Sequence, residues 1–130
     1  MVIAFVMIDS KNVNKWIVML FSLFLTACSP KVTETGKASY YADNFEGRKT
    51  ASGEKYSAVK FTAAHKTLPF GTKIKVKNLI NGKTVKVVVN DRGPFVAGRI
   101  VDLSGVAANQ LGLKSAGTAR VEIKYKKIKK

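Results

Sequence analysis

The chain has 130 residues, of which 46% are hydrophobic and 24% are charged, so it has room for a single domain of ordinary globular composition. It carries one cysteine and one histidine, and we therefore expect no transition-metal site, which needs several convergent ligands of these types. With 23 Lys and Arg against 8 Asp and Glu its net charge is +15, which predicts attraction to polyanions such as nucleic acid, anionic lipid headgroups or the acidic polymers of a cell wall.

Residues 1–27 are predicted to be a targeting segment and not part of the fold. Two lysines precede an apolar stretch that is shorter than the roughly 20 residues a membrane-spanning helix needs, although an uncleaved membrane helix is the alternative. The stretch ends in Leu-Thr-Ala-Cys (25–28), which resembles the lipobox of bacterial lipoproteins. The resemblance implies that residues 1–27 are a lipoprotein signal peptide, with cleavage before Cys28, a diacylglycerol on its thiol and an acylated amine. Such an anchor would be stable, since one acyl chain binds a membrane weakly but two or more hold it firmly. Ser29 follows instead of Asp, which resembles the pattern of Gram-negative lipoproteins sent on to the outer membrane. The resemblance implies a location in the bacterial cell envelope, at the outer membrane facing the periplasm.

Residues 28–35 are predicted to be the lipidated cysteine and a short polar linker, and residues 36–125 the folded domain. Within the domain, short runs of β-forming residues are separated by turn signals such as Asn81-Gly82, which is the pattern of an all-β barrel or sandwich. The predicted strands lie at residues 38–41, 73–77, 83–90, 100–103 and 119–125.

One helix is predicted between the last two strands. Ser104 can cap its N-terminus, the residues up to Leu111 favour helical turns, and Gly112 can end it. Residues 126–130 are rich in lysine and are predicted to be a solvated basic tail. No internal repeat and no second domain is apparent in the sequence.

Carboxylates are scarce outside the signal peptide, because removal of residues 1–27 leaves seven Asp and Glu residues and a net charge of +14. The chemistry open to the remaining residue types is acid–base catalysis by one or two carboxylates, with a contribution from His65. Asp91 is one candidate, since a hydrophobic strand delivers it to a Gly-Pro loop, where active groups are often placed. The sequence supports the competing interpretation equally well, in which Asp91 caps the turn and pairs with Arg92.

Three other polar residues have a structural explanation when each is considered alone. Glu54 lies in a polar loop and is typical of a solvated surface acid. A single histidine such as His65 more often makes structural hydrogen bonds than acts in catalysis. Asp102 is expected to bond backbone donors near the start of the predicted helix.

Five segments taken together carry a more specific signal. In chain order they are Gly-Lys-Ala-Ser-Tyr-Tyr (36–41), Gly-Arg-Lys-Thr-Ala-Ser-Gly-Glu (47–54), Thr-Ala-Ala-His-Lys-Thr-Leu-Pro-Phe-Gly-Thr (62–72), Asn-Asp-Arg-Gly-Pro-Phe (90–95) and Gly-Arg-Ile-Val-Asp-Leu-Ser (98–104). With these motifs the chain closely resembles the rare lipoprotein A (RlpA) family over residues 36–125. One departure is Tyr40-Tyr41-Ala42, where the family usually has Trp-Tyr-Gly.

The resemblance implies a mainly β fold, a six-stranded double-psi β-barrel with one or two short helices, which expansins and family 45 endoglucanases share. It also implies an endolytic lytic transglycosylase. Such an enzyme cleaves the β-1,4 bond between N-acetylmuramic acid and N-acetylglucosamine in peptidoglycan strands stripped of stem peptides, and closes a 1,6-anhydro ring. The implied catalytic residues are Asp91, Glu54 and His65. The substrate contacts that we expect beside them are Tyr40, Tyr41, Lys66 and Arg92.

In the expected mechanism, Asp91 protonates the bridging oxygen and then, as a base, takes the proton of the C6 hydroxyl that closes the ring. Glu54 is expected close to Asp91, and His65 is expected to hydrogen-bond one of the two. Arg92 is expected to turn away from Asp91, towards the glycan or another acid, because an ion pair would lower the pKa that a general acid needs.

Two other functions are compatible with the sequence. The barrel could bind glycan strands without cutting them, as expansins do. Nucleic-acid binding would use the positive charge, but a lipid-anchored envelope protein meets little nucleic acid. We therefore expect peptidoglycan and a membrane as partners, a monomer, no nucleic acid, no metal and no cofactor.

Overall fold

The computed structural model describes residues 30–128 and contains six strands and one α-helix there, so the mainly β fold expected from the sequence is confirmed. The strands are β1 (Lys31–Tyr40), β2 (Thr62–Ala64), β3 (Lys73–Asn78), β4 (Thr84–Asp91), β5 (Arg99–Leu103) and β6 (Ala119–Lys126). The helix α2 spans Gly105–Gln110, and a single 3-10 turn, η2, spans Asp43–Phe45.

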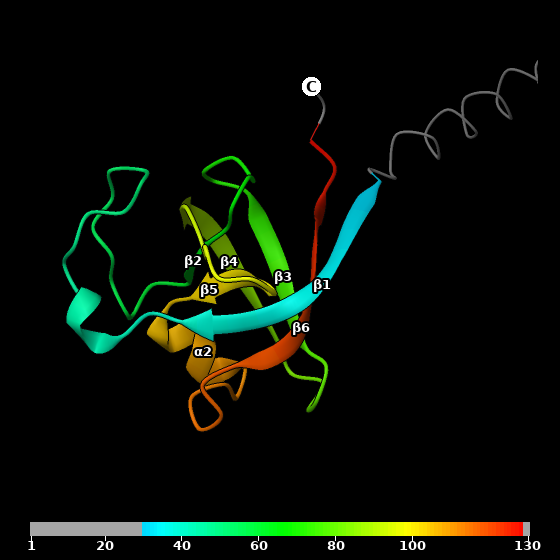
Figure 1. Ribbon diagram of the computed structural model, residues 1–130. Coiled ribbons are helices and arrows are strands. Elements are labelled where there is room, and N and C mark those ends of the chain that lie inside the picture. Colours follow the sequence, from blue (N-terminus) through cyan, green and yellow to red (C-terminus); the bar gives the residue numbers. More distant parts are fainter. Residues whose placement is uncertain (1–29, 129–130) are drawn as a thin grey trace, which may run out of the picture. The chain divides into compact units, whose positions relative to one another are not determined.

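The six strands close into a barrel in the order β1-β5-β2-β4-β3-β6, which confirms the expected six-stranded barrel. The pairs β1–β5 and β2–β4 are parallel, and the other pairings are antiparallel. The two long strands β1 and β6 run side by side (Figure 1). Because the barrel is closed, none of the six strands is left as an unpaired edge.

The barrel interior follows from the two-residue period of a strand, in which successive side chains point to opposite faces. In β3 the lysines are exposed while Ile74 and Val76 are buried, and in β4 the buried valines are Val85, Val87 and Val89. These side chains pack with buried residues of β5 and β6, and two buried alanines of α2 join the same cluster. The hydrophobic effect therefore acts on one face of each strand, and the lysine-bearing face stays in water.

β1 begins at Lys31, so the prediction of a linker over residues 28–35 is wrong in its described part. From Lys31 to Thr35 the strand pairs with the segment Glu122–Lys126 of β6, and Lys126 is therefore a strand residue and not part of a tail. A strand held by backbone hydrogen bonds to a partner needs no run of apolar side chains, which explains why a polar sequence forms this wall of the barrel.

Residues 1–29 and 129–130 lie outside the described residues, and with them the predicted signal peptide, Cys28 and the end of the basic tail. The predictions for those residues stay predictions. In the part of the chain that is described, no helix has the length and apolar character needed to cross a membrane.

The helix forms where the sequence predicts it, but its N-terminus is held differently. Ser104 makes no side-chain cap, and its hydroxyl instead accepts a hydrogen bond from the backbone N–H of Thr62 at 3.4 Å. Gly112 ends the helix as predicted, with φ at +73°, a conformation that glycine adopts without a steric penalty.

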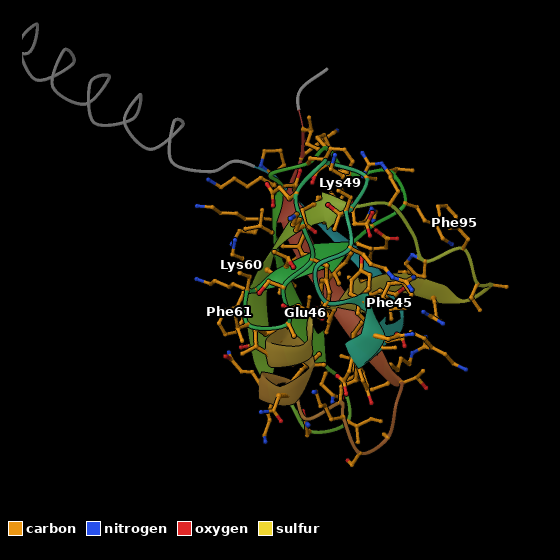
Figure 2. All side chains as sticks on the ribbon, turned by 90° about the vertical axis from the view of Figure 1, so that its left-hand side faces the viewer. Phe45, Glu46, Lys49, Lys60, Phe61 and Phe95 are labelled. Carbon is orange, nitrogen blue, oxygen red and sulfur yellow. The ribbon has the colours of Figure 1, made fainter. Side chains whose placement is uncertain are left out.

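A long segment without strands, residues 41–61, connects β1 to β2 and crosses the side of the barrel that faces the viewer in Figure 2. Its anchor is the buried Tyr56, whose hydroxyl accepts a hydrogen bond from the backbone N–H of Gly105 at 3.1 Å. Further along, the backbone N–H of Ser52 donates to the carbonyl of Asn90 at 3.2 Å. These bonds hold the middle of the segment against the end of β4, where the candidate site lies.

Candidate active site

The end of β4 carries one residue more than its parallel neighbour β2. The register shifts just before Ala64 pairs with Asp91, and Asn90 is the additional residue. Bulges of this kind re-aim side chains and are frequent beside active sites. Here Asn90 is buried and its amide donates to Glu54 Oε2 at 3.4 Å, whereas Asp91 reaches an open groove.

The Asp91 carboxylate is held by three hydrogen-bond donors from three parts of the chain. Oδ1 accepts the backbone N–H of Ala51 at 2.8 Å and that of Arg92 at 2.9 Å. Oδ2 accepts the hydroxyl of Tyr41 at 2.5 Å. Since each carboxylate oxygen can accept two hydrogen bonds, Oδ2 keeps one acceptor position for a substrate group.

The Tyr41 hydroxyl beside Asp91 stays protonated. Burial, followed by the hydrogen bond to Asp91 and the charge of that carboxylate, raises the pKa of Tyr41 far above its usual value. The ring is fixed by Tyr56, with centroids 4.5 Å apart, and by Phe45 at 5.8 Å. Tyr41 is therefore a fixed donor that orients the Asp91 carboxylate.

The groove beside Asp91 has a volume of about 560 Å³, and we call it the Asp91 groove. Of the residues expected at the site, those that line it are Tyr40, Tyr41, Asp91 and Arg92. Its rim includes Phe95, which is 83% exposed, and Val96, which is 52% exposed. Figure 2 shows Phe95 on a loop that projects from the barrel. Exposed apolar side chains at a groove mark a binding surface, and the sequence alone did not single them out.

A second carboxylate, Asp102, also lines the Asp91 groove. Ala64 of β2 pairs with Asp91 on one side and with Asp102 of β5 on the other, so the two carboxylates flank one small side chain. The expectation that Asp102 bonds backbone donors near the helix is wrong, because its Oδ1 accepts a hydrogen bond from Arg99 Nη2 at 2.6 Å. The sequence did not predict that Asp102 lies at the site, because its proximity to Asp91 depends on the antiparallel pairing of β2 with β5.

Arg92 does not pair with the carboxylate next to it. Its Nη1 donates to the carbonyl oxygens of Leu68, at 2.7 Å, and His65, at 3.2 Å, and its guanidinium lies 4.2 Å from the ring centroid of Phe70. The side chain thus turns away from Asp91, but towards backbone carbonyls and not towards a glycan or another acid. Arg92 holds the loop after β2 against the end of β4, and Asp91 has no cationic partner in the part of the chain that the structure describes.

Glu54 lies on the exposed loop that supplies Ala51 to Asp91, but it does not line the Asp91 groove. Its carbonyl accepts hydrogen bonds from the backbone N–H and the hydroxyl of Thr50, both at 2.8 Å, and its carboxylate accepts the Asn90 amide. Among the described residues no hydrogen bond joins Glu54 to Asp91. The structure therefore links Glu54 to the end of β4 through Asn90, the residue that directly precedes Asp91.

His65 is buried, and its ring faces away from both expected partners. Nδ1 accepts the backbone N–H groups of Thr67 at 3.2 Å and Leu68 at 3.1 Å, so the ring proton belongs to Nε2, which donates to Glu34 Oε2 at 3.2 Å. The expectation that His65 hydrogen-bonds Asp91 or Glu54 is wrong. Only its backbone meets the site, where its N–H donates to the carbonyl of Asp91 at 3.1 Å.

Glu34, the partner of His65, was missed because the sequence analysis placed it in a linker. It stands on β1, and its charge, together with a hydrogen bond, adds to the burial that raises the pKa of Tyr125. The only sequence signal was its place in an alternating polar run, which the pairing with β6 turns into a strand.

The remaining expected contacts are placed as follows. Tyr40 donates its hydroxyl to the carbonyl of Lys114 at 3.1 Å, and Lys66 is exposed without lining the Asp91 groove.

Ala42, which replaces the glycine usual in the family, has φ at −68°, so no glycine conformation is required there. Within residues 30–128 no group of three or more metal-ligating side chains is close enough to hold a metal ion.

Curated relatives cover most of this chain. Over 91 residues it is 55% identical to the endolytic peptidoglycan transglycosylase RlpA of Neisseria meningitidis, a match of 70% of this chain and 38% of the relative. Over 117 residues it is 47% identical to the probable enzyme of that name from Treponema pallidum, a match of 90% of this chain and 37% of the relative. The chain thus spans about a third of the length of the curated relatives it matches.

Solved structures share the fold. The Streptomyces papain inhibitor aligns with a TM-score of 0.60 and 26% identity, over 74% of this chain and 96% of that protein. An expansin of Clavibacter michiganensis aligns with a TM-score of 0.57 and 22% identity, over 76% of this chain and 52% of that protein, which shows the fold alone. The sequence model of the double-psi β-barrel family described as "Lytic transglycolase" matches residues 33–123. Since that match covers most of the chain and nearly all of the barrel, the chain belongs to the lytic transglycolase family of double-psi β-barrels.

Proposed function

We propose that this protein is an endolytic lytic transglycosylase that cleaves peptidoglycan strands between N-acetylmuramic acid and N-acetylglucosamine. Membership of the lytic transglycolase family supports the proposal, as do relatives that are named peptidoglycan transglycosylases. The preferred substrate in this proposal is a strand without stem peptides, because the Asp91 groove offers apolar rings and few charges that are free to bind a peptide.

The observation that carries the proposal is the free acceptor position on Asp91 Oδ2. Three donors fix the carboxylate, and the guanidinium next to it is engaged elsewhere. A general acid or base must stand within hydrogen-bond reach of the group that it serves, and Asp91 lines the groove that would hold the strand.

The reaction then needs one carboxyl group and no water. In the acid form the proton of Asp91 occupies the remaining position of Oδ2. Asp91 gives this proton to the bridging oxygen, the bond from that oxygen to C1 of the muramic acid breaks, and an oxocarbenium-like state forms. The C6 hydroxyl of the same sugar attacks C1, and Asp91 takes the hydroxyl proton. The products are a free hydroxyl on N-acetylglucosamine and a 1,6-anhydro ring, and Asp91 is protonated again.

Asp102 is a supporting residue in this scheme and not the acid. Its Oδ1 accepts a hydrogen bond from Arg99 at 2.6 Å, whereas within residues 30–128 Asp91 has no cationic partner. From the other side of Ala64, the negative charge of Asp102 can stabilise the positive oxocarbenium-like state.

The second candidate function is a binding module that grips glycan without cutting it. The exposed Phe95 and Val96 favour this reading, since an apolar rim binds sugar faces whether or not the bond is broken. Incubation of the protein with peptidoglycan stripped of stem peptides separates the two functions. Strands that end in 1,6-anhydro rings, detected by mass spectrometry, support the enzyme, and sedimentation with the glycan without such products contradicts it.

We further propose that the protein is anchored to a membrane of the bacterial envelope by acyl chains on Cys28. The proposal is supported by the lipobox-like sequence at residues 25–28, which lies outside the described residues. Bacteria that express the chain and are fed a labelled palmitate should incorporate the label, and the Cys28→Ser variant should not. Equal labelling of both chains would contradict the anchor.

A further inference from the structure

A second groove, separate from the Asp91 groove, lies over β3, β4 and β6. Its volume is about 710 Å³, and six lysines line it, so we call it the basic groove. These lysines are Lys31, Lys73, Lys75, Lys86, Lys124 and Lys126. Apolar groups, among them Phe61, Val88 and Tyr125, lie between them. The basic groove and the Asp91 groove share no lining residue.

Three of these lysines form a row across three neighbouring strands. Lys75 of β3 pairs in register with Lys86 of β4 on one side and with Lys124 of β6 on the other. Neighbouring strands are about 4.8 Å apart, and like charges directly opposite each other destabilise a sheet. The row therefore works against the stability of the barrel.

Internal carboxylates offset little of this repulsion. In the described part of the chain, Lys124 is the one lysine of the basic groove with an ion-pair partner, Glu122 at 3.4 Å. Lys75 and Lys86 are exposed and have none. The row of lysines lowers the stability of the barrel, and the described carboxylates do not neutralise it. Binding of an external anion would explain why the lysines stand there.

The apolar side chains of the basic groove indicate that its ligand has apolar faces as well as anionic groups. Phe61 is 42% exposed and Tyr125 is half-buried, so both present a ring beside the lysines. A concave surface that combines rings with ammonium groups fits a chain with both apolar faces and anionic groups. A flat membrane surface does not enter such a groove.

We propose that the basic groove binds an anionic glycan strand at a distance from the catalytic groove, with lysines on the carboxylates of the strand and Phe61 and Tyr125 against its sugar rings. This inference rests on the proposed function for the identity of the ligand, because the lactyl group of each muramic acid supplies one carboxylate. Figure 2 shows Phe61 and Phe95 at opposite sides of the view, so a strand in the basic groove leaves the Asp91 groove open.

The test compares two triple variants of the full chain, purified in mild detergent. The first is Lys75→Gln with Lys86→Gln and Lys124→Gln, which removes the row. The matched control removes the same charge from exposed lysines outside the basic groove, Lys37→Gln with Lys49→Gln and Lys83→Gln. Both are mixed with insoluble peptidoglycan stripped of stem peptides, and bound protein and 1,6-anhydro products are measured in the same tubes.

We expect the row variant to bind about tenfold more weakly than the native chain, since three exposed ionic contacts are lost, and the control variant to bind nearly as the native chain does. The KM for strand cleavage should rise in the row variant while kcat stays unchanged. The single variant Lys75→Gln should raise Tm by about 1–4 °C, because it relieves the like-charge row. Peptidoglycan with its carboxylates converted to neutral amides should bind native chain and row variant equally.

Equal losses in the two triple variants would overturn the proposal, since total charge and not the basic groove would then decide binding. A single-stranded oligonucleotide or phosphatidylglycerol vesicles that displace the glycan through the same three lysines at lower concentration would also overturn it. Lysine-dependent binding without any 1,6-anhydro product would contradict the proposed function and leave the groove standing. Formation of 1,6-anhydro products together with binding that does not depend on these lysines would support the proposed function and overturn the role of the basic groove.

Discussion

In the Asp91 groove each charged side chain takes part in a hydrogen bond, whereas among the described residues five of the six lysines of the basic groove take part in no side-chain hydrogen bond and no ion pair. Asp91 is held by Tyr41, and Asp102 is held by Arg99. Partners fix a side chain in one geometry, which acid–base chemistry requires. Free lysines keep their rotamers and can take up an external anion, so the two grooves suit a reaction and a holding surface respectively.

A large effect is expected from Tyr41, whose hydroxyl holds Asp91 Oδ2. Tyr41→Phe keeps the ring but removes the one hydrogen bond that residues 30–128 make to this oxygen. A hydrogen bond to a charged group contributes about 1.5–3 kcal/mol, so we expect kcat for strand cleavage to fall by about 10–100-fold with little change in KM. An unchanged kcat would show that a fixed Asp91 is not needed for the reaction.

A smaller effect is expected from the second carboxylate of the Asp91 groove. Asp102→Asn should lower kcat by about tenfold or less, because the residue acts through its charge and not by proton transfer. The double variant with Arg99→Gln separates the charge of Asp102 from its ion pair. If Asp102→Asn abolishes the products while binding persists, Asp102 and not Asp91 is the acid.

The half-buried Tyr41 also predicts how stability depends on pH. The pKa of Tyr41 in the fold is raised above the value of about 10 in an unfolded chain, chiefly by burial, so the unfolded chain loses its proton first as the pH rises. Stability should be complete below pH 10 and fall above it, by less than about 1.4 kcal/mol per pH unit for this residue, since solvent still reaches part of the ring. Urea unfolding between pH 9 and 11 measures the slope, which should be flatter in Tyr41→Phe.

The smallest expected effect lies in the basic groove. Glu122→Gln removes the carboxylate beside Lys124 and should lower the free energy of unfolding by about 0.2–1 kcal/mol at low salt, and by less at high salt. Asp43→Asn, an exposed aspartate outside both grooves, is the matched control for the lost charge. A stabilising Glu122→Gln would contradict the view that the lysine row repels itself.

The sequence was sufficient for the elements with strong local signals. The strands with alternating Lys and aliphatic residues, the helix end at Gly112 and the place of Asp91 after a hydrophobic strand are all local features. What the sequence did not reveal depends on pairing between distant strands. Glu34 meets His65 only because β1 extends to Lys31 along β6.

The two carboxylates of the Asp91 groove illustrate the same limit. Asp102 approaches Asp91 only because β2, with the small Ala64, lies between β4 and β5. The row of lysines is likewise a product of register, since Lys75, Lys86 and Lys124 are far apart in the chain. Neither arrangement has a signature within one segment of the sequence.

The central claim, that Asp91 is the acid and base of strand cleavage, is tested most directly by Asp91→Asn against Asp43→Asn. Both variants lose one carboxylate, but only the first loses the group that transfers the proton. With peptidoglycan stripped of stem peptides, we expect 1,6-anhydro products to fall by about 10²–10⁴-fold in Asp91→Asn, with binding retained, and to be unchanged in Asp43→Asn. Products from Asp91→Asn at the native rate would contradict the account.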